Sequence, residues 1–292
     1  KSQLKTFLEN RAQSPETVFS DTLRTTMQRD QPRFRPMTVD EIPRMDLAKS
    51  MAFYRDRFAD AGDFTFVFVG RLDLEALRPL VRRYLASLPA LGRKEAWKDW
   101  RVPPPEGVVE RTVEKGVEPK SLTAVVFSGP FRNDPANRVA IRAVAQVLET
   151  RLRKLLRETL SGTYDVAVGP YYSMIPRQEY RLTIDLGADP ARMEELSAAV
   201  FREIARLRKK GPTAREVAEV RLAEERDHET DSRQNGWWLG QMVERLRNGE
   251  DPAGIARVAE SFRLLTKASV KAAARAYLDT TRYVQVTLYP EK

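Results

Sequence analysis

The sequence predicts an α+β protein made of two parts. Amphipathic helical stretches and short β-rich runs are interspersed along the 292 residues, and 42% of the residues are apolar, which is enough for packed cores. Residues 89–107 contain four prolines and show neither a helical nor a strand period, as expected of a linker. Because domains usually hold ~100–200 residues, the length also suggests about two domains.

Before the linker, the pattern predicts helices with recognisable first residues. Ser14 is expected to cap a helix with Pro15 at its first position, and Asp46 and Asp73 to cap two further helices. Between those two helices, DFTFVFVG (63–70) is rich in β-forming residues and apolar almost throughout. We therefore expect residues 63–70 to form a strand that is buried on both faces.

After the linker, strand-like runs surround a long helix. This helix is expected to begin at Asn133 or Asp134, with Pro135 in its first turn, and to continue to about Thr159. Three or four further helices are expected before the last strand. The expected strands are VVERTVEKG (108–116), SLTAVVFSG (121–129), TYDVAVGPYYSMI (163–175), EYRLTIDLG (179–187) and RYVQVTLYP (282–290).

A helix–corner–strand plan occurs twice, in residues 37–70 and 265–290. Each copy has a threonine after a large apolar residue, an amphipathic helix with alanines, a short polar corner and then an apolar run. We infer that the first part is the closing portion of a repeat whose opening elements are missing. Chance similarity between helix–turn–strand units is the alternative explanation.

The formal charge of +9 comes from 50 Lys and Arg against 41 Asp and Glu. Acidic residues are interspersed among the basic ones, and no strand combines aromatic with basic residues as RNA-binding motifs do. Solvated helix faces therefore explain the charge better than a nucleic-acid surface does. No run approaches the ~20 apolar residues of a membrane span. Zero cysteines exclude disulfides and thiolate metal ligands.

The residue types exclude the common hydrolytic centres. A zinc hydrolase site needs three protein ligands, but the one histidine, His228, lies in a highly charged helical stretch where a solvated position is expected. No HxxEH motif can be formed, so we expect no zinc ligand set in this chain. Ser128, in FSGPF, has neither a GxSxG elbow nor a base, and Ser-Gly is ordinary turn chemistry.

Two hydrogen-bond donors stand out where the long helix gives way to a strand, in LLRETLSGTYDVAV (155–168). In a structural interpretation, Arg157 complements the helix dipole, Gly162 is the left-handed residue after the helix and Tyr164 is a strand aromatic. In a functional interpretation, a guanidinium fork and a phenol on rigid elements grip a peptide carbonyl or a developing oxyanion. Spacing alone leaves both interpretations open.

The stretch LLRETLSGTYDV resembles the Arg-x6-Tyr element in the C-terminal half of inverzincin metallopeptidases, the pitrilysin and insulin-degrading enzyme family. DLAKSMAFYRDRFADAGDFTFVFVGRLDLEALRPLVRRYLASLP (46–89) is similar to the helix–strand–helix ending of a domain in that family. GVEPKSLTAVVFSGPF (116–131), with the long helix after it, is similar to the opening of the next domain. The resemblance covers nearly the whole chain and is greatest to the C-terminal, non-zinc portion of bacterial zinc proteases.

For the fold, the resemblance implies two-layer domains, each a mostly antiparallel sheet covered by helices. Four such repeats form two half-shells around a closed chamber in that family. Residues 1–88 would then be the C-terminal part of the third repeat, truncated in this chain, and residues 89–107 the linker. Residues 108–292 would be the complete fourth repeat.

For function, the resemblance implies the substrate-binding portion of a zinc endopeptidase, in which Arg157 orients the peptide backbone. Tyr164 would hydrogen-bond the scissile carbonyl or its tetrahedral successor. Zinc and HxxEH would belong to an N-terminal half, in the same polypeptide or a partner subunit, so this chain alone is expected to bind no zinc and to be inactive. A non-enzymatic shell or assembly subunit of the same fold is the alternative. A bacterial periplasmic or cell-envelope location is expected, with the cytoplasm as the alternative.

Overall fold

The computed structural model describes residues 1–100, 102–159 and 163–291, without the side chains of residues 157–159, 163 and 164. The chain divides into two compact units, which are described separately below. Unit 1 comprises residues 1–39, 100–225 and 259–292, and unit 2 comprises residues 40–99 and 226–258.

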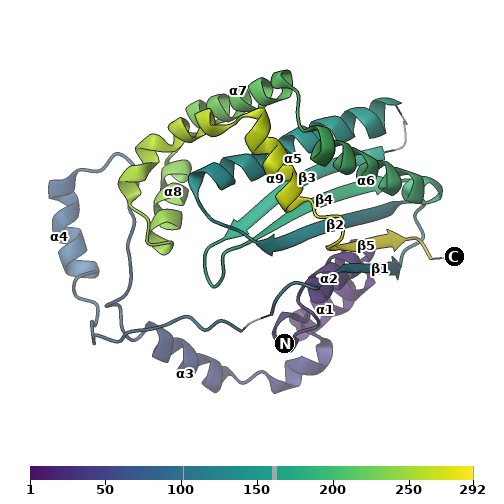
Figure 1. Ribbon diagram of the computed structural model, residues 1–292. Coiled ribbons are helices and arrows are strands. Elements are labelled where there is room, and N and C mark those ends of the chain that lie inside the picture. Colours follow the sequence, from purple (N-terminus) through teal and green to yellow (C-terminus); the bar gives the residue numbers. More distant parts are fainter. Residues whose placement is uncertain (101, 160–162, 292) are drawn as a thin grey trace. The chain divides into compact units, whose positions relative to one another are not determined.

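A five-stranded sheet in the order β1-β5-β2-β4-β3 lies at the centre of unit 1 (Figure 1). Strands β1 and β5 are parallel, and every other neighbouring pair is antiparallel. The α+β class, the mostly antiparallel sheet and the five strands expected after residue 107 are therefore confirmed. The strands are β1 (Val108–Glu114), β2 (Ser121–Pro130), β3 (Thr163–Ser173), β4 (Glu179–Ala188) and β5 (Tyr283–Tyr289).

Helices cover both faces of this sheet to different extents. Helices α5, α6 and α9 pack on one face, and α2 packs against β5 and β1 (Figure 1). Helix α1 in turn packs on α2. The helices that lie in unit 1 or begin there are α1 (Ser2–Gln13), α2 (Pro15–Met27), α5 (Pro135–Arg153), α6 (Met193–Lys210), α7 (Ala214–Asp231) and α9 (Lys267–Tyr277).

Strand β2 is buried on both faces. Successive strand residues point to opposite faces of a sheet. Val125 and Phe127 face α5 and are almost fully buried. The alternate residues of β2 belong to an apolar cluster under α2. The buried members of that cluster are Phe19, Met27, Val113, Ala124, Val126, Val284, Val286 and Leu288. Two apolar layers therefore hold the sheet, one on each side.

The predicted helix caps are confirmed. Ser14, Asp46, Asp73 and Asp134 each accept a hydrogen bond from a backbone N–H of the first helical turn. Prolines occupy the first positions of α2 and α5, where no N–H is needed. These interactions are local, which is why the sequence predicts them well.

Unit 2 contains helices α3 (Leu47–Phe58), α4 (Leu74–Tyr84) and α8 (Asn235–Arg247) and the end of α7. Two 3-10 segments, η2 (Val39–Arg44) and η5 (Pro252–Leu264), each contain residues of both units. The prediction of a strand at residues 63–70 is wrong, because residues 64–69 have no regular secondary structure. Within the described ranges, no backbone hydrogen bond joins residues 65–69 to another segment, so the run lacks the partner that would make it a strand.

Candidate functional site

The two predicted donors belong to elements on either side of a helix-to-strand corner. Helix α5 continues into a π-helical segment, η3 (Lys154–Thr159), which includes Arg157, and β3 includes Tyr164. Pairing of β3 with β4 is irregular between Thr163 and Asp165, around Tyr164. The side chains of Arg157 and Tyr164, and all of Gly162, lie outside the described residues. Their convergence on one target therefore stays a prediction.

The last turns of α5 are attached to β3. The Glu149 carboxylate accepts a hydrogen bond from the backbone N–H of Val168, with 3.1 Å between Oε2 and N. Leu152 and Leu156, on the following turns, have no exposed surface. The two elements that hold the corner are thus joined to each other by a polar bond and by buried apolar contacts.

A second attachment joins the same end of α5 to α6 and α7. The Arg151 guanidinium donates to Glu203 at 3.0 Å, to the two oxygens of Glu216 at 2.6 and 2.8 Å, and to the Gly211 carbonyl at 3.2 Å. Hydrogen bonding from Arg151 is the main cause that lowers the pKa of Glu216 to about 2. We call Glu149, Arg151, Glu203 and Glu216 the clamp, because they fix the helix end from two sides.

The free edge of β3 is closed over its central residues. The N–H of Val166 donates to the Asp165 carboxylate at 2.9 Å, and the N–H of Val168 donates to Glu149. Pro170, two residues after Val168 and therefore oriented in the same way, has no N–H. Because alternate residues of an edge strand direct their N–H groups outward, these three positions offer no donor to an added strand. A peptide that reaches this region therefore finds no outward N–H donor on β3 from Val166 to Pro170.

The sheet surface next to this edge is polar. On the face opposite α5, Asp165 of β3 and Asp185 of β4 are diagonal neighbours, and both are exposed. The pKa of Asp185 is raised, mainly because the surrounding sheet displaces water from its carboxylate and also because Asp165 is negatively charged. The surface beside the corner is thus acidic.

The residues that the structure describes do not fit a zinc site. In the described ranges, no three His, Asp, Glu or Cys side chains are placed to hold one metal ion. His228 lies on α7, where its ring makes an edge contact with Trp237 at a centroid distance of 5.2 Å. It is half-buried, whereas a fully solvated position was expected. Trp237 comes from α8, so the helical pattern of α7 alone does not reveal this contact.

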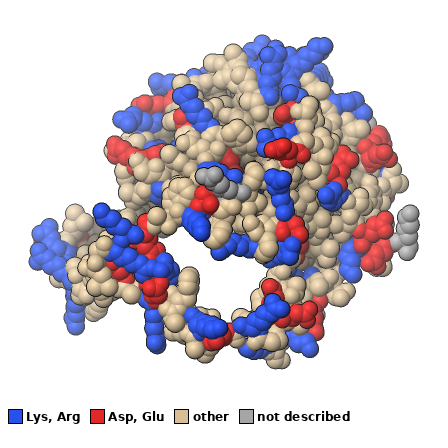
Figure 2. Space-filling model, turned by 60° about the horizontal axis from the view of Figure 1, so that its bottom comes forward, with Lys and Arg blue, Asp and Glu red and all other residues tan. Residues whose placement is uncertain are grey.

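Charged side chains of both signs share the surface. On the face seen in Figure 2, acidic residues lie among the basic ones and do not leave one continuous basic area. This arrangement agrees with solvated helix faces as the origin of the +9 charge. No helix in the described part of the chain is long and apolar enough to cross a membrane.

Sequence reasoning did not find the clamp. Its residues lie in helical stretches where Glu and Arg are frequent, and a buried ion pair has the same sequence pattern as a solvated one. The one indication in the sequence that Glu149 and Arg151 are not solvated was their position beside the apolar face of α5. The partners of Arg151, Glu203 and Glu216, lie more than 50 residues further along the chain, at separations that local patterns do not cover.

Known proteins share the family and the fold of this chain. The family model described as "Peptidase M16 inactive domain" matches residues 44–223. A curated relative from Arabidopsis thaliana, named zinc protease PQQL-like, is 24% identical over 260 residues, which are 80% of this chain and 26% of that protein. Two solved structures share the fold.

The periplasmic protease PqqL from Escherichia coli matches with a TM-score of 0.85 at 22% identity, over 99% of this chain and 32% of that one. A peptidase M16 inactive domain from Pseudomonas fluorescens matches with a TM-score of 0.77 at 21% identity, over 100% of this chain and 69% of that one. The chain therefore spans about a quarter to a third of the length of the two PqqL-type proteins.

Proposed function

Because this chain belongs to the family of peptidase M16 inactive domains, we propose that it is the non-catalytic, peptide-binding portion of a zinc-dependent endopeptidase. The observation that carries the proposal is the clamped corner between α5 and β3, which holds the elements of Arg157 and Tyr164 on a rigid support. A π-helical segment such as η3 is rare and frequently marks a functional site.

Arg157 and Tyr164 have different roles in this proposal. Arg157 donates to backbone carbonyls of the bound peptide and orients it, an interaction that is already made in the ground state. Tyr164 donates its phenolic hydrogen to the scissile carbonyl oxygen, and the bond strengthens as negative charge develops on that oxygen. The satisfied edge of β3 supports contacts of this kind, since the strand offers a peptide no outward N–H donor from Val166 to Pro170.

Zinc would supply the Lewis acid that polarises the carbonyl and lowers the pKa of the attacking water. The described residues of this chain do not provide its ligands, so the ion would be held by an N-terminal half, in the same polypeptide or in a partner subunit. The relative named zinc protease PQQL-like is about four times as long as the region that it shares with this chain, which leaves ample polypeptide for that half.

The proposal includes a domain division and a location. Residues 1–88 are the closing part of one peptidase-like repeat, residues 89–107 are a linker and residues 108–292 are a complete repeat. This division follows the plan of the repeat, whereas the two compact units follow packing. A periplasmic location is supported by the similarity to the periplasmic protease PqqL of Escherichia coli.

Peptide cleavage by the full-length protein tests the two roles. We expect Arg157→Ala to raise KM with a smaller effect on kcat, because it removes an interaction made in both ground and transition states. Tyr164→Phe should lower kcat by about 10²–10³-fold, the usual cost of losing an oxyanion donor. Unchanged turnover in both variants would favour the shell or assembly role instead.

Two control variants separate these effects from loss of folding. Arg215→Ala removes a guanidinium that pairs only with the exposed Glu219. Tyr283→Phe removes a phenol on β5, with β2 and β4 between it and β3. Both controls should retain activity, and all four variants should retain the melting temperature of the parent protein.

A further inference from the structure

We propose that the exposed surface of β3 and β4 selects peptides with an arginine or lysine side chain close to the cleaved bond, and that Asp165 and Asp185 bind this side chain. The inference rests on the proposed peptide-binding role, for which it names the class of substrate. Asp165 directly follows Tyr164, the proposed contact of the scissile carbonyl. An extended peptide advances ~3.3–3.6 Å per residue, so the basic residue lies within roughly three residues of the cleaved bond.

The sheet face opposite α5 is covered at one end and open at the other. Helix α2 lies over β5 and β1, whereas β4 and β3 form the far end of the sheet (Figure 1). Four alternate residues of β3 point away from α5 and are exposed, namely Asp165, Ala167, Gly169 and Tyr171. A Cβ added to Gly169 would meet no described atom within 4 Å. A peptide therefore has room to lie along β3 beside the carboxylates.

Asp165 and Asp185 place two like charges side by side on this surface. They are diagonal neighbours on adjacent strands, and Asp165 accepts the backbone N–H of Val166 at 2.9 Å. Among the described side chains, neither carboxylate takes part in an ion pair. Arg181, on the same face of β4, pairs with Glu179 at 3.7 Å. The two aspartates therefore present uncompensated negative charge to a molecule on this part of the sheet.

A bound cation would relieve the cost of this arrangement. Displacement of water by the sheet raises the pKa of Asp185, and the negative charge of Asp165 raises it further. A guanidinium or ammonium group beside the two carboxylates favours their charged forms and donates hydrogen bonds to them. An arginine side chain has five N–H donors, which is enough for both carboxylates.

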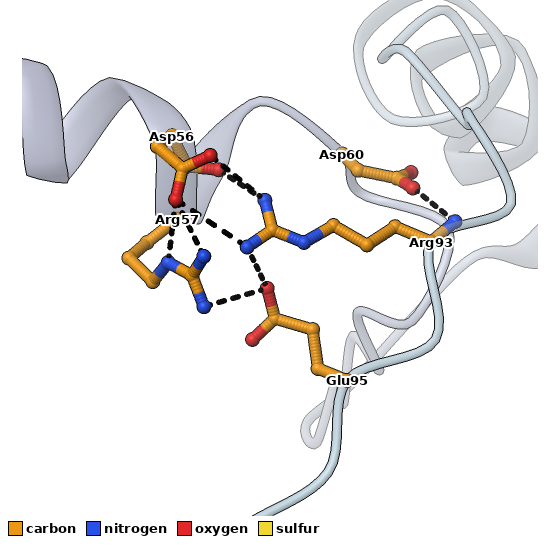
Figure 3. A network of polar contacts seen from close by, with 5 residues as sticks. All are labelled: Asp56, Arg57, Asp60, Arg93 and Glu95. Carbon is orange, nitrogen blue, oxygen red and sulfur yellow. Dashed lines mark hydrogen bonds and ion pairs between the residues drawn. The ribbon is translucent and has the colours of Figure 1, made fainter.

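Carboxylates in other parts of the chain already have such partners. In unit 2, Asp56 and Glu95 each pair with the guanidinium groups of both Arg57 and Arg93 (Figure 3). Basic residues outnumber acidic ones by 50 to 41, so a shortage of cations does not explain two unpaired aspartates. A ligand can supply the cation, and Arg157 is the alternative source. Peptides that differ in a single charge distinguish these two sources.

The overall charge of the chain favours the opposite preference. A net charge of +9 attracts acidic peptides from a distance and repels basic ones. Salt screens this long-range effect beyond about 8 Å under physiological conditions, but it screens an ion pair in contact much less. A preference for a basic peptide would therefore have to come from a local acidic site.

Fluorescence anisotropy with labelled peptides tests the inference on the full-length protein as encoded by its gene, in EDTA to prevent cleavage. Four unstructured peptides differ at one position, which holds arginine, lysine, norleucine or glutamate, and they contain no other charged side chain. Norleucine resembles lysine without its charge. The Kd of the arginine and lysine peptides should be at least about tenfold lower than that of the norleucine peptide, as one hydrogen bond to a charged group provides.

Three variants assign this preference to the two carboxylates. Asp165→Asn and Asp185→Asn keep the shape of each side chain and remove its charge, so each should raise the Kd of the basic peptides about tenfold. Both should leave the Kd of the norleucine peptide within about twofold of the parent value. Asp185→Lys should reverse the preference, so that the glutamate peptide binds more tightly than the arginine peptide. The control Glu118→Gln changes an exposed carboxylate in the β1–β2 turn and should leave all four affinities unchanged.

Equal Kd values for the arginine and norleucine peptides would overturn the inference. Equal weakening of all four peptides in the aspartate variants would also overturn it, because the carboxylates would then support Arg157 and not the ligand. Melting temperatures equal to that of the parent protein exclude loss of folding as the cause. Unchanged turnover in Tyr164→Phe, with the charge preference intact, would refute the oxyanion contact and leave the substrate class standing. Absence of binding by all four peptides would contradict the proposed function and this inference together.

Discussion

The carboxylate of Glu149 on α5 accepts a hydrogen bond from the backbone N–H of Val168 on β3, so a helix side chain occupies the outer edge of the sheet. This single bond both attaches the helix end to the strand and removes a donor from the free edge. It links the stability of the corner to the accessibility of the edge.

Glu149→Ala should therefore expose the edge of β3. A bond to a charged acceptor contributes about 1.5–3 kcal/mol, so we expect the Val168 amide to exchange at least about tenfold faster. Hydrogen exchange with peptide-level resolution over residues 163–173 measures the change. Glu149→Gln keeps an acceptor at the same place and should show a smaller effect. Equal effects of both variants would mean that the bond does not protect this edge.

Removal of Arg151 should destabilise unit 1 strongly. Glu203 is 8% exposed and would lose its closer charged partner, keeping only the longer pair with Arg206 at 3.7 Å, and the loss of a buried partner typically costs about 3 kcal/mol or more. Urea denaturation of Arg151→Ala measures the loss. The control Arg215→Ala breaks an exposed pair on α7 and should cost less than about 0.5 kcal/mol. Similar losses in both variants would contradict the assignment of the clamp.

The clamp should also make the free energy of unfolding depend on pH. The pKa of Glu216 is lowered from 4.5 to about 2 in the folded protein, so the unfolded chain binds a proton first as the pH falls. The stabilisation is fully present above about pH 4.5 and is lost as the pH falls towards 2. Urea denaturation between pH 6 and pH 2 measures the free energy of unfolding of the parent protein and of Glu216→Gln. The difference between these two free energies should shrink as the pH falls through this window. A difference in unfolding free energy that stays constant with pH would rule out a lowered pKa of the Glu216 carboxylate.

A buried pair of hydroxyls in the sheet offers a double-mutant test. Thr123 of β2 and Thr287 of β5 lie opposite each other with 2.9 Å between their oxygens, and they are 2% and 7% exposed. Thr287→Val leaves the Thr123 hydroxyl without this partner and should cost about 1–3 kcal/mol. The double variant Thr123→Val/Thr287→Val should be nearly neutral, because both polar groups are gone. Thermal or urea unfolding of the three variants checks this order, and additive losses would contradict it.

The corner that follows α3 in unit 2, residues 59–63, should depend on Asp60. Asp60→Ala removes the acceptor shared by the N–H groups of Gly62, Leu91 and Arg93, so their amides should exchange about tenfold faster. Asp63→Ala removes a neighbouring exposed carboxylate and should leave these amides unchanged. Exchange rates of β2 provide the reference for unit 1.

The predictions from sequence succeeded where structure is determined locally. Caps such as Ser14 and Asp134 depend on residues within one helical turn, and runs of β-forming residues located β2 and β4 without knowledge of their partners. The run at 63–70 shows the limit of this reasoning. Its composition is that of a strand, but a strand also needs a neighbouring backbone, and composition does not report whether that neighbour is present.

The candidate site was only partly accessible from the sequence. The motif located Arg157 and Tyr164 at a helix-to-strand corner, and the structure places that corner at the junction of η3 and β3. The supports of the corner were not predicted, since Arg151 finds Glu203 and Glu216 through packing of α5 on α6 and α7. Charge alone could not distinguish these residues from solvated ones.

The parallel pairing of β1 with β5 has a consequence for biosynthesis. Val108 pairs with Tyr283, so the first strand of the sheet cannot find its neighbour until residues 109–283 have left the ribosome. At ~5–20 residues per second, that delay is roughly ten seconds or more. Nascent chains should therefore present an unpaired β1 to chaperones, and slow synthesis should lengthen that exposure.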